Sequence, residues 1–345
     1  MDEQGKTGAA VADVAVSSRV RLARNIDNLP FPARMNKEQG LKVIEMVRDS
    51  VFNSSETVAK NMVMFDIQKL NPIDRQVLVE KHLISPDFTE GRLDRAAIIS
   101  RDEKISVMVN EEDHVRLQCI YPGMQLDNAW QLCNKLDLLM EEKLDFAFDP
   151  GSGYLTCCPT NLGTGIRASV MLHLPALSMT GYINGVLEAC GKLGLAVRGI
   201  YGENSEALGN MYQISNQVTL GQTEEEIIAS INNVTGQIVD QERTLRKELH
   251  RQSAPRFEDR IYRSLGILAN ARIISTEESL KLLSDVRLGV DMKLIGGIAA
   301  NTLNEIMVYI QPAILQKLAG KALAPDERDM RRADLIRKSL NAKAQ

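Results

Sequence analysis

The sequence has 345 residues, of which 44% are hydrophobic and 25% are charged, a composition typical of soluble globular proteins and unlike that of disordered chains. Its formal net charge of −4 excludes a general attraction to nucleic acid or acidic membranes, so an anion site would have to be local. Five scattered cysteines and four histidines make neither a disulfide framework nor a zinc pattern. No uncharged run is long enough to cross a membrane, so we expect a cytoplasmic protein. The chain is too long for one small core, so we also expect two domains.

The first part of the chain mixes strand and helix signals. Residues 12–24 predict a short strand that turns into an arginine-rich segment, and residues 36–52 carry apolar side chains at helical spacing. Two β-rich runs, 96–100 and 105–110, are separated by a charged tetrapeptide and predict an antiparallel hairpin. Residues 126–144 again have the period of a helix.

A turn rich in cysteine, proline and glycine follows at residues 155–165. Pro159 removes a backbone donor and restricts the residue before it, so we expect a strand to end here and Cys158 to face a cleft. Residues 167–174 are then expected to continue as a helix, whose first N–H groups would form an anion site. Residues 195–201 predict another strand.

Helical signals dominate the rest of the chain. Thr223 and Glu226 have capping-box spacing and open a long amphipathic helix that ends near residue 250. Beyond that point the strand signals vanish and several helical runs follow. We therefore predict an α+β catalytic domain over residues 1–250 and an all-α domain over residues 251–345.

Acidic groups, thiols and arginines occur together at the predicted strand ends. The acidic groups lie in NEEDH at 110–114 and in GENSE at 202–206, and the thiols are Cys157 and Cys158. Taken singly, each has a simple explanation, because acidic runs are usually solvated turns and a lone thiol usually packs inside. Their joint occurrence with a set of arginines suggests a site. These arginines are Arg19, Arg21, Arg116, Arg167 and Arg198.

Several guanidinium groups in one cleft repel one another unless a polyanion neutralises them. A nucleoside triphosphate is the natural candidate, because phosphoryl transfer depends mainly on positioning and on positive charge around the migrating group. Arginine suits this role because it makes forked, charge-assisted hydrogen bonds to phosphate oxygens.

The carboxylates and the thiol need a different partner, for which a guanidinium is the best candidate. Two carboxylates and a thiolate can hold its planar fork of N–H donors, and a carboxylate can accept the proton that the attacking nitrogen must lose. We expect Cys158 to be a thiolate because of nearby positive charge and the helix expected after it. Gly163 and Gly165 would permit close backbone approach, and Arg167 would meet phosphate.

Five segments resemble motifs of the phosphagen (guanidino) kinase family, in order, across roughly residues 14–245: SSRVRLAR, NEEDHVRLQ, CPTNLGTGIRASV, RGIYGENSEA and YQISNQVTLG. The resemblance implies an antiparallel sheet flanked by helices, and the use of ATP with Mg²⁺ held mainly through the phosphates. It implies that Glu112 and Glu203 bind the guanidinium and accept its proton, and that Cys158 is the substrate thiol. The residues that it implies for nucleotide binding are Ser17, Ser18, Arg19, Val20, Arg21, His82, Arg116, Arg167, Ala168, Ser169, Val170, Met171, Arg198, Gly199, Ile200, Tyr201 and Gly202.

A helical C-terminal part stands in place of the N-terminal helical domain of metabolic family members, and in this the chain resembles the bacterial protein arginine kinases, the McsB branch of the family. That resemblance implies transfer of the ATP γ-phosphoryl group to arginine side chains of proteins, including a heat-shock repressor, in protein quality control with a Clp protease. It further implies an activator protein and a homodimer formed through the helical domain. Neither nucleic acid nor membrane is an expected partner, and no protein side chain is expected to hold a metal directly. The RDMRRA element implies an allosteric phosphoarginine pocket made of Arg328, Asp329, Arg332 and Ala333.

Three other functions are compatible with the residues alone. The chain could phosphorylate free arginine or another small guanidine. It could be a non-catalytic adaptor that binds a repressor, although the presence of Glu112, Glu203 and Cys158 counts against this. A thiol hydrolase that uses Cys158 with His173 as base is the weakest alternative, because nothing supplies an acid to orient the histidine.

Overall fold

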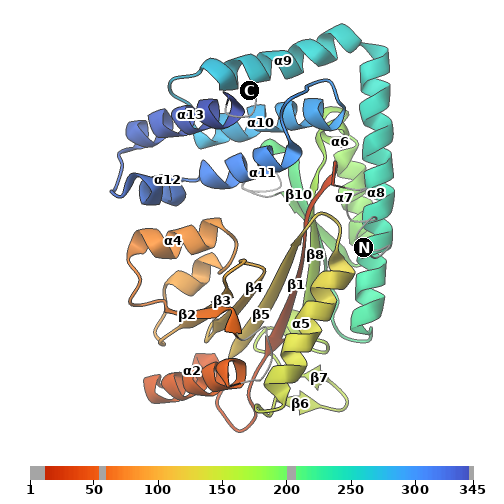
Figure 1. Cartoon of the computed structure of the whole chain (residues 1–345). Coiled ribbons are helices and arrows are strands. Elements are labelled where there is room, and N and C mark those ends of the chain that lie inside the picture. Colours follow the sequence, from red (N-terminus) through yellow and green to blue (C-terminus); the bar gives the residue numbers. More distant parts are fainter. Residues whose placement is uncertain (1–11, 54–59, 200–206, 342–345) are drawn as a thin grey trace. The chain divides into compact units, whose positions relative to one another are not determined.

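The computed structural model describes residues 12–53, 60–199 and 207–341, and all structural statements below concern these residues. Its main feature is an eight-stranded sheet with the strand order β2-β3-β4-β5-β1-β8-β10-β9 (Figure 1). The pairings of β2 with β3, β3 with β4, β4 with β5 and β5 with β1 are all antiparallel. The predicted antiparallel sheet flanked by helices is confirmed.

The strands are short, and most of them belong to this sheet, while β6 and β7 form a separate two-stranded hairpin. Their bounds are β1 (Ala15–Arg24), β2 (Met62–Asp66), β3 (Ala96–Ser100), β4 (Ile105–Val109), β5 (Val115–Pro122), β6 (Phe148–Asp149), β7 (Gly153–Tyr154), β8 (Ile166–His173), β9 (Leu195–Gly199) and β10 (Met211–Asn216).

The helices of the described residues fall between and after these strands. The α-helices are α2 (Lys37–Phe52), α4 (Pro72–Glu80), α5 (Leu126–Glu141), α6 (Pro175–Met179), α7 (Ile183–Lys192), α8 (Glu224–Gln252), α9 (Ala254–Asn270), α10 (Thr276–Asp291), α11 (Ala300–Tyr309), α12 (Pro312–Ala319) and α13 (Pro325–Asn341). Short 3-10 helices are η1 (Pro32–Arg34), η2 (Pro86–Thr89), η3 (Pro159–Asn161) and η4 (Leu208–Asn210). None of the helices in the described part of the chain combines the length and apolar character needed to cross a membrane.

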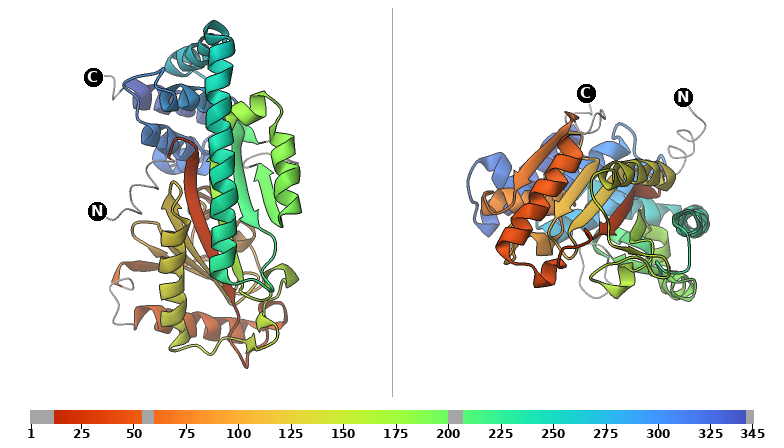
Figure 2. Two further views of the ribbon diagram at one scale, coloured as in Figure 1. Left: turned by 90° about the vertical axis from the view of Figure 1, so that its right-hand side faces the viewer. Right: turned by 90° about the horizontal axis from the view of Figure 1, so that it is seen from below.

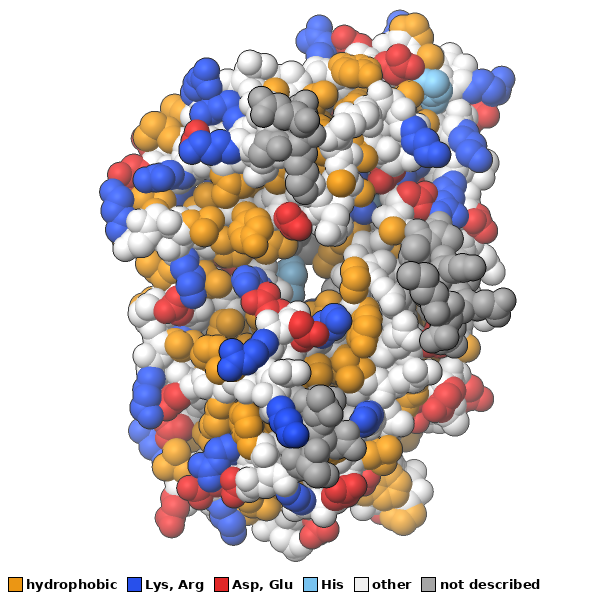
Figure 3. Space-filling model, in the orientation of Figure 1, with side chains coloured by type: hydrophobic (Ala, Val, Ile, Leu, Met, Phe, Trp, Pro, Cys, Tyr) orange, Lys and Arg blue, Asp and Glu red, His pale blue; other side chains and the backbone are white. Residues whose placement is uncertain are grey.

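The chain forms two compact units, and each is described by itself. The sheet unit comprises Ser17–Val170 and Ser215–Asn233, and the helical unit comprises Met1–Val16, Met171–Ile214 and Val234–Gln345. Strands β1, β8 and β10 and helix α8 each begin in one unit and end in the other. Acidic and basic side chains are interspersed on the face shown in Figure 3, as expected for a chain of small net charge.

The predicted hairpin of the sheet unit is confirmed, with Ala97 of β3 opposite Met108 of β4. Both strands are buried along their whole length because each face of this part of the sheet is covered. Ala97 and Met108 pack with Phe88 in a small apolar cluster on one face. The predicted helices α2 and α5 contact each other (Figure 1), and α2 also contacts β4 while α5 contacts β5.

Alternation along β1 separates the arginines of the predicted arginine-rich segment. Because successive side chains of a strand point to opposite faces, Arg24 lies on the opposite face from Arg19 and Arg21. Arg24 is 1% exposed and pairs with Asp137 of α5, with 2.7 Å between Nη2 and Oδ2. The expected turn after a short strand is therefore wrong, because the arginines are part of one ten-residue strand.

The expected helix over residues 167–174 is also wrong, because Ile166–His173 forms strand β8. Six of its eight residues are buried, so both strand faces are covered and no alternation marks it as a strand. The expected strand end at Cys158 is wrong too, since Pro159 opens the one-turn helix η3 instead. The loop therefore leads into a strand, and not into the helix whose N-terminus was expected to form an anion site.

Helix α8 begins with the predicted capping box, in which the Thr223 and Glu226 side chains each accept the other residue's backbone N–H. Figure 2 shows it as one long, nearly straight helix, and it ends at Gln252 as predicted. Helices α9, α10, α11 and α13 then enclose the apolar core of the helical unit, which includes Ile261, Leu283, Leu303 and Ile336.

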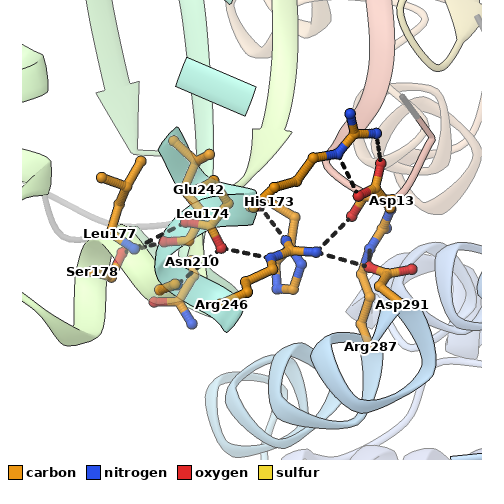
Figure 4. Close-up of polar contacts among 12 residues, drawn as sticks. Asp13, His173, Leu174, Leu177, Ser178, Asn210, Glu242, Arg246, Arg287 and Asp291 are labelled. Carbon is orange, nitrogen blue, oxygen red and sulfur yellow. Dashed lines mark hydrogen bonds and ion pairs between the residues drawn. The ribbon is translucent and has the colours of Figure 1, made fainter. Parts of the chain in front are cut away.

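A buried network of charged side chains lies within the helical unit (Figure 4). Arg246 of α8 donates to Glu242 Oε1 at 2.7 Å and to the carbonyl oxygens of His173 and Asp13 at 3.0 and 3.2 Å. Glu242 in turn accepts the first N–H groups of α6, from Ala176 and Leu177, at 3.0 and 2.9 Å. The network thereby joins the chain before β1, the end of β8, and helices α6 and α8.

Helix α10 contributes the other side of this network. Asp291 lies 3.4 Å from Arg287 and 3.8 Å from Arg246, and burial raises the pKa of Asp291 to about 6 despite these two positive charges. His173 is fully buried and shares a hydrogen bond of 2.8 Å with Ser284. Burial, and then Arg287 and Arg246, hold its pKa well below the ordinary value, so His173 is a neutral structural residue.

Candidate active site

Arginine side chains gather on one face of the sheet unit. In the antiparallel pairing of β1 with β5, Arg21 lies opposite Gln118, and Ala23 lies opposite Arg116. Residues two apart on a strand share a face, so Arg19, Arg21 and Ala23 project to the same side. Directly opposite residues of paired strands also share a face, so Arg116, which lies opposite Ala23, projects to this side too.

These three guanidinium groups and that of Arg167 on β8 repel one another. The pKa of Arg19 is lowered to about 10, first by burial and then by the positive charges of Arg116 and Arg167. Burial lowers the pKa of Arg21 well below its ordinary value, and the other three arginines act in the same direction. The Nε atom of Arg21 is buried and has no hydrogen-bond partner among the described residues. Such a cluster favours a bound polyanion, which would neutralise it and supply acceptors.

Glu111 is absent from the predicted site, yet it contacts this cluster directly. Its carboxylate lies 2.5 Å from Arg116 Nη1, and its side chain is only 6% exposed. Burial tends to raise the pKa of Glu111, but Arg116, a hydrogen bond from Ser85 and the charge of Arg21 together hold it below its usual value. Glu111 thus partly neutralises the arginines. The sequence alone does not show which of the adjacent glutamates, Glu111 or Glu112, pairs with an arginine.

Glu112 and Cys158 meet in a pocket next to the arginines. The pocket has a volume of about 130 Å³, and Arg21, Arg116 and Arg167 also line it. Burial and then the negative charge of Asp113 raise the pKa of Glu112, while Arg116 and a hydrogen bond with Cys158 act in the opposite direction. A carboxylate with a raised pKa is a better proton acceptor. A larger hollow of about 530 Å³ at the β3–β4 turn contains neither this pair nor the arginines.

The neighbouring thiols Cys157 and Cys158 have different surroundings. Burial and then Asp113 raise the pKa of Cys157 to about 12, so this thiol stays protonated. The sulfur of Cys158 lies 3.0 Å from Thr160 Oγ1 and lines the pocket. Of these two thiols, Cys158 therefore lines the pocket together with Glu112.

Two glycines of the loop at residues 155–165, here called the thiol loop, allow neighbouring backbone segments to pack closely. A Cβ atom on Gly165 would lie 2.7 Å from the carbonyl oxygen of Ala23, and one on Gly163 would lie 2.4 Å from that of Thr219. Both glycines also have positive φ angles, of 68° and 106°, where other residues are strained. The close approach expected from the sequence thus occurs, but to neighbouring backbone.

Other predicted nucleotide-binding residues of the sheet unit lie around the same strands. His82 has a φ of 58°, and burial followed by the charge of Arg19 lowers its pKa to about 4, which places it beside the arginine cluster. Ser18 is buried and donates to the carbonyl oxygen of Gly123 at 2.9 Å. Ser17 lies one residue before it and is half-buried. The remaining members are buried in strands: Val20, Ala168, Ser169 and Val170.

Several predicted residues lie elsewhere or outside the described chain. Met171, Arg198 and Gly199 belong to the helical unit, and Arg198 is exposed near the end of β9. Glu203, the predicted second carboxylate, lies outside the described residues, as do Ile200, Tyr201 and Gly202.

The RDMRRA element lies on α13. Arg332 is 1% exposed and donates to the carbonyl oxygens of Ile310 and Ile274, each at 2.9 Å, and to the carboxylate of Asp329. It therefore ties α13 to neighbouring segments of the helical unit. Arg328 is half-buried, and Ala333 packs in the apolar core. The phosphoarginine pocket stays a prediction.

Two family models match the chain. The ATP:guanido phosphotransferase C-terminal catalytic domain matches residues 42–245, and the protein-arginine kinase McsB C-terminal domain matches residues 254–345. Among solved structures, lombricine kinase has a TM-score of 0.60 at 23% identity and covers 69% of this chain and 68% of that chain. A duplicated taurocyamine kinase from Schistosoma mansoni with bound transition state analogue components has the same TM-score at 26% identity, over 68% of this chain and 33% of that chain.

Curated relatives are similar over nearly their whole length. Protein-arginine kinase of Caldanaerobacter subterraneus is 50% identical over 331 residues, which is 96% of this chain and 98% of that protein. Those of Moorella thermoacetica and Bacillus subtilis are 52% and 48% identical, each over 330 residues, covering 95% and 96% of this chain and 94% and 91% of those proteins. The chain therefore belongs to the ATP:guanido phosphotransferase family, on its protein-arginine kinase branch.

Proposed function

We propose that the chain transfers the γ-phosphoryl group of ATP to arginine side chains of other proteins. The observation that carries the proposal is the pairing of Glu112 with Cys158 in a pocket that is also lined by arginines. Membership of the family supports phosphoryl transfer from ATP to a guanidine. The names of the curated relatives support a guanidine that is part of a protein.

The two halves of the pocket suit the two substrates. Arg21, Arg116 and Arg167 would bind the phosphate oxygens and stabilise charge on the migrating group. Glu112 would take a proton from the attacking guanidinium nitrogen while the new N–P bond forms and the bond from γ-phosphorus to the bridging oxygen breaks, leaving ADP. Cys158 would orient the guanidinium beside that carboxylate. The predicted partner carboxylate, Glu203, would hold the guanidinium's other nitrogens.

Mg²⁺ would be bound through the substrate. Among the residues that the structure describes, no group of three possible metal ligands occurs, whereas the unfilled donor of Arg21 and the clustered charges fit a triphosphate. Bound to the phosphates, Mg²⁺ would supply further positive charge at the transferred group.

Regulation and partners form the second part of the proposal. We propose that the RDMRRA element binds phosphoarginine and adjusts activity, that the chain dimerises through its helical part, and that it is cytoplasmic. Its proposed partners are an activator protein, a heat-shock repressor as substrate, and a Clp protease that receives marked proteins. Support comes from the match of residues 254–345 to the C-terminal domain of the protein-arginine kinases.

Mass spectrometry under neutral handling tests the proposed reaction. The chain is incubated with Mg-ATP and either an arginine-rich protein or free L-arginine, and acid-labile phosphate on arginine is measured. Label on the protein is expected, and label on free arginine alone would contradict the proposal. Glu112→Gln should slow the appearance of the label at least about 100-fold but keep ATP binding, while Glu45→Gln, an exposed change on α2, should have no effect.

The proposed regulation has a separate test. Arg328→Ala should leave basal transfer unchanged but weaken the response to added phosphoarginine, measured as rate against phosphoarginine concentration. An unchanged response would contradict the proposed pocket without affecting the proposed reaction.

A further inference from the structure

The side chain of Asn25, directly after β1, joins three segments of the sheet unit. Asn25 is 1% exposed. Its Nδ2 donates to Asp113 Oδ1 at 2.6 Å and to the carbonyl oxygen of Leu155 at 3.0 Å, and its Oδ1 accepts the backbone N–H of His114 at 2.9 Å. The amide therefore connects the end of β1, the turn that carries Glu112 and the loop that carries the thiol.

Asp113 makes the second connection. It is 2% exposed, and the same Oδ1 atom accepts the backbone N–H of Cys157 at 2.7 Å. Asp113 is bonded along the chain to Glu112, and Cys157 is bonded to Cys158. The hydrogen bond therefore links the immediate neighbours of the two side chains that meet in the pocket.

We propose that Asn25 and Asp113 are positioning residues that set the placement of the Glu112–Cys158 pair for phosphoryl transfer. The inference rests on the proposed function, because it assumes that this pair acts on the guanidinium. An amide is suited to position 25, since it supplies two donors and one acceptor in one plane. A carboxylate there would face Asp113 and lose both donors, and an alanine would leave Asp113 without its closest donor.

Asp113 also acts through its charge. The charged or titratable groups that act on Glu112 are Asp113, Arg116, Glu111 and Cys158, and after burial Asp113 makes the largest contribution to the raised pKa of Glu112. A neutral side chain of the same shape keeps an acceptor for Cys157 but removes this charge. Asp113→Asn therefore separates the electrostatic effect from the geometric one.

Steady-state kinetics of the full chain distinguish positioning from nucleotide binding. Asn25→Asp is expected to lower kcat about 100-fold, because misplacing reacting groups by about 1 Å costs this much, while KM for ATP changes less than about 3-fold. Asn128→Asp on α5, which adds the same charge elsewhere in the sheet unit, is the matched control and should leave kcat unchanged. A kcat within about 3-fold of the parent for Asn25→Asp, or equal changes in kcat and KM, would overturn the proposal.

The pH profile of kcat is the readout that a purely structural role would not move. Asp113→Asn is expected to shift the acid limb to lower pH, because Glu112 loses a negative neighbour and its pKa falls. An unshifted limb would overturn the electrostatic part of the proposal. Thermal unfolding of each variant shows whether it folds. If Asn25→Asp does not fold, the isosteric variant Asp113→Asn still tests the proposal.

Alkylation of Cys158 keeps the inference separate from the proposed function, since it needs no turnover. Iodoacetamide labelling is followed by peptide mass spectrometry, which distinguishes Cys158 from Cys157. Asn25→Asp is expected to raise the labelling rate of Cys158 several-fold, because the thiol loop is no longer held at Leu155. An unchanged rate would overturn the positioning role, whatever the substrate of the enzyme.

Discussion

Replacing Arg246 by methionine should strongly destabilise the helical unit. Arg246 and Glu242 have side chains that are 4% and 0% exposed. The change therefore leaves a buried carboxylate that still accepts hydrogen bonds from the N–H groups of Ala176 and Leu177 but has lost its positively charged partner. It also removes the donor to the His173 carbonyl oxygen. Removing one partner of a buried pair typically costs about 3–5 kcal/mol, and this is the expected loss in the free energy of unfolding.

Urea denaturation followed by circular dichroism measures this loss. Arg263→Met is the control, because Arg263 and Asp259 form a similar helical pair that is 76% and 63% exposed, and such a pair contributes little. Combining Arg246→Met with Glu242→Gln should recover a large part of the loss, since the second change removes the unpaired charge. A loss below about 1 kcal/mol for Arg246→Met would refute the view that the network stabilises this unit through paired charges.

Three further predictions follow from the electrostatics. Glu112→Gln should lower kcat by about 10²–10⁴-fold, the usual contribution of a general base, while the calorimetric affinity for ATP stays unchanged; transfer at the parental rate would contradict the assigned base. Arg21→Met should weaken ATP binding by roughly 10-fold or more and yet raise the melting temperature of the free protein, because it removes a repelling charge; a lower melting temperature would argue against repulsion. Asp291 holds its proton more tightly in the folded than in the unfolded chain, so the stability that it contributes is present below pH 3.8 and is lost as pH rises to about 6, by up to about 3 kcal/mol. Asp291→Asn should flatten this part of the stability profile, and an unchanged slope in pH-dependent urea titrations would contradict the raised pKa.

Much of the fold could be predicted from local patterns. Helix α5 carries a clear helical period, the β3–β4 hairpin consists of two short β-rich runs separated by a charged turn, and the capping box at Thr223 marks the start of α8 within a residue. Strand β8 could not be recognised, because burial on both faces removes the alternation that identifies a strand. The glycines before it resemble a loop that leads into a phosphate-binding helix, although their role is to pack against Ala23 and Thr219.

The sequence predicts the kind of ligand that the candidate site binds, but not the contacts between the residues of the site. Clustered arginines imply an anion, and the structure brings Arg19, Arg21, Arg116 and Arg167 within reach of one another's charge. The sequence does not show that Glu111 pairs with one of them, because that contact depends on how the turn folds. It also does not show strand register, which separates these arginines from others on the opposite face.

The helical unit is built from separate segments of the chain, including residues 171–214 and 234–345, and this limits where the chain can be cut. A truncation at residue 250 would leave Arg246 on one fragment and Asp291 on the other. It would likewise separate His173 from Ser284. Fragments cut at this point would each expose surfaces that the other normally covers, so exchanging the C-terminal segment between relatives requires its contacts in residues 171–214 to be exchanged with it.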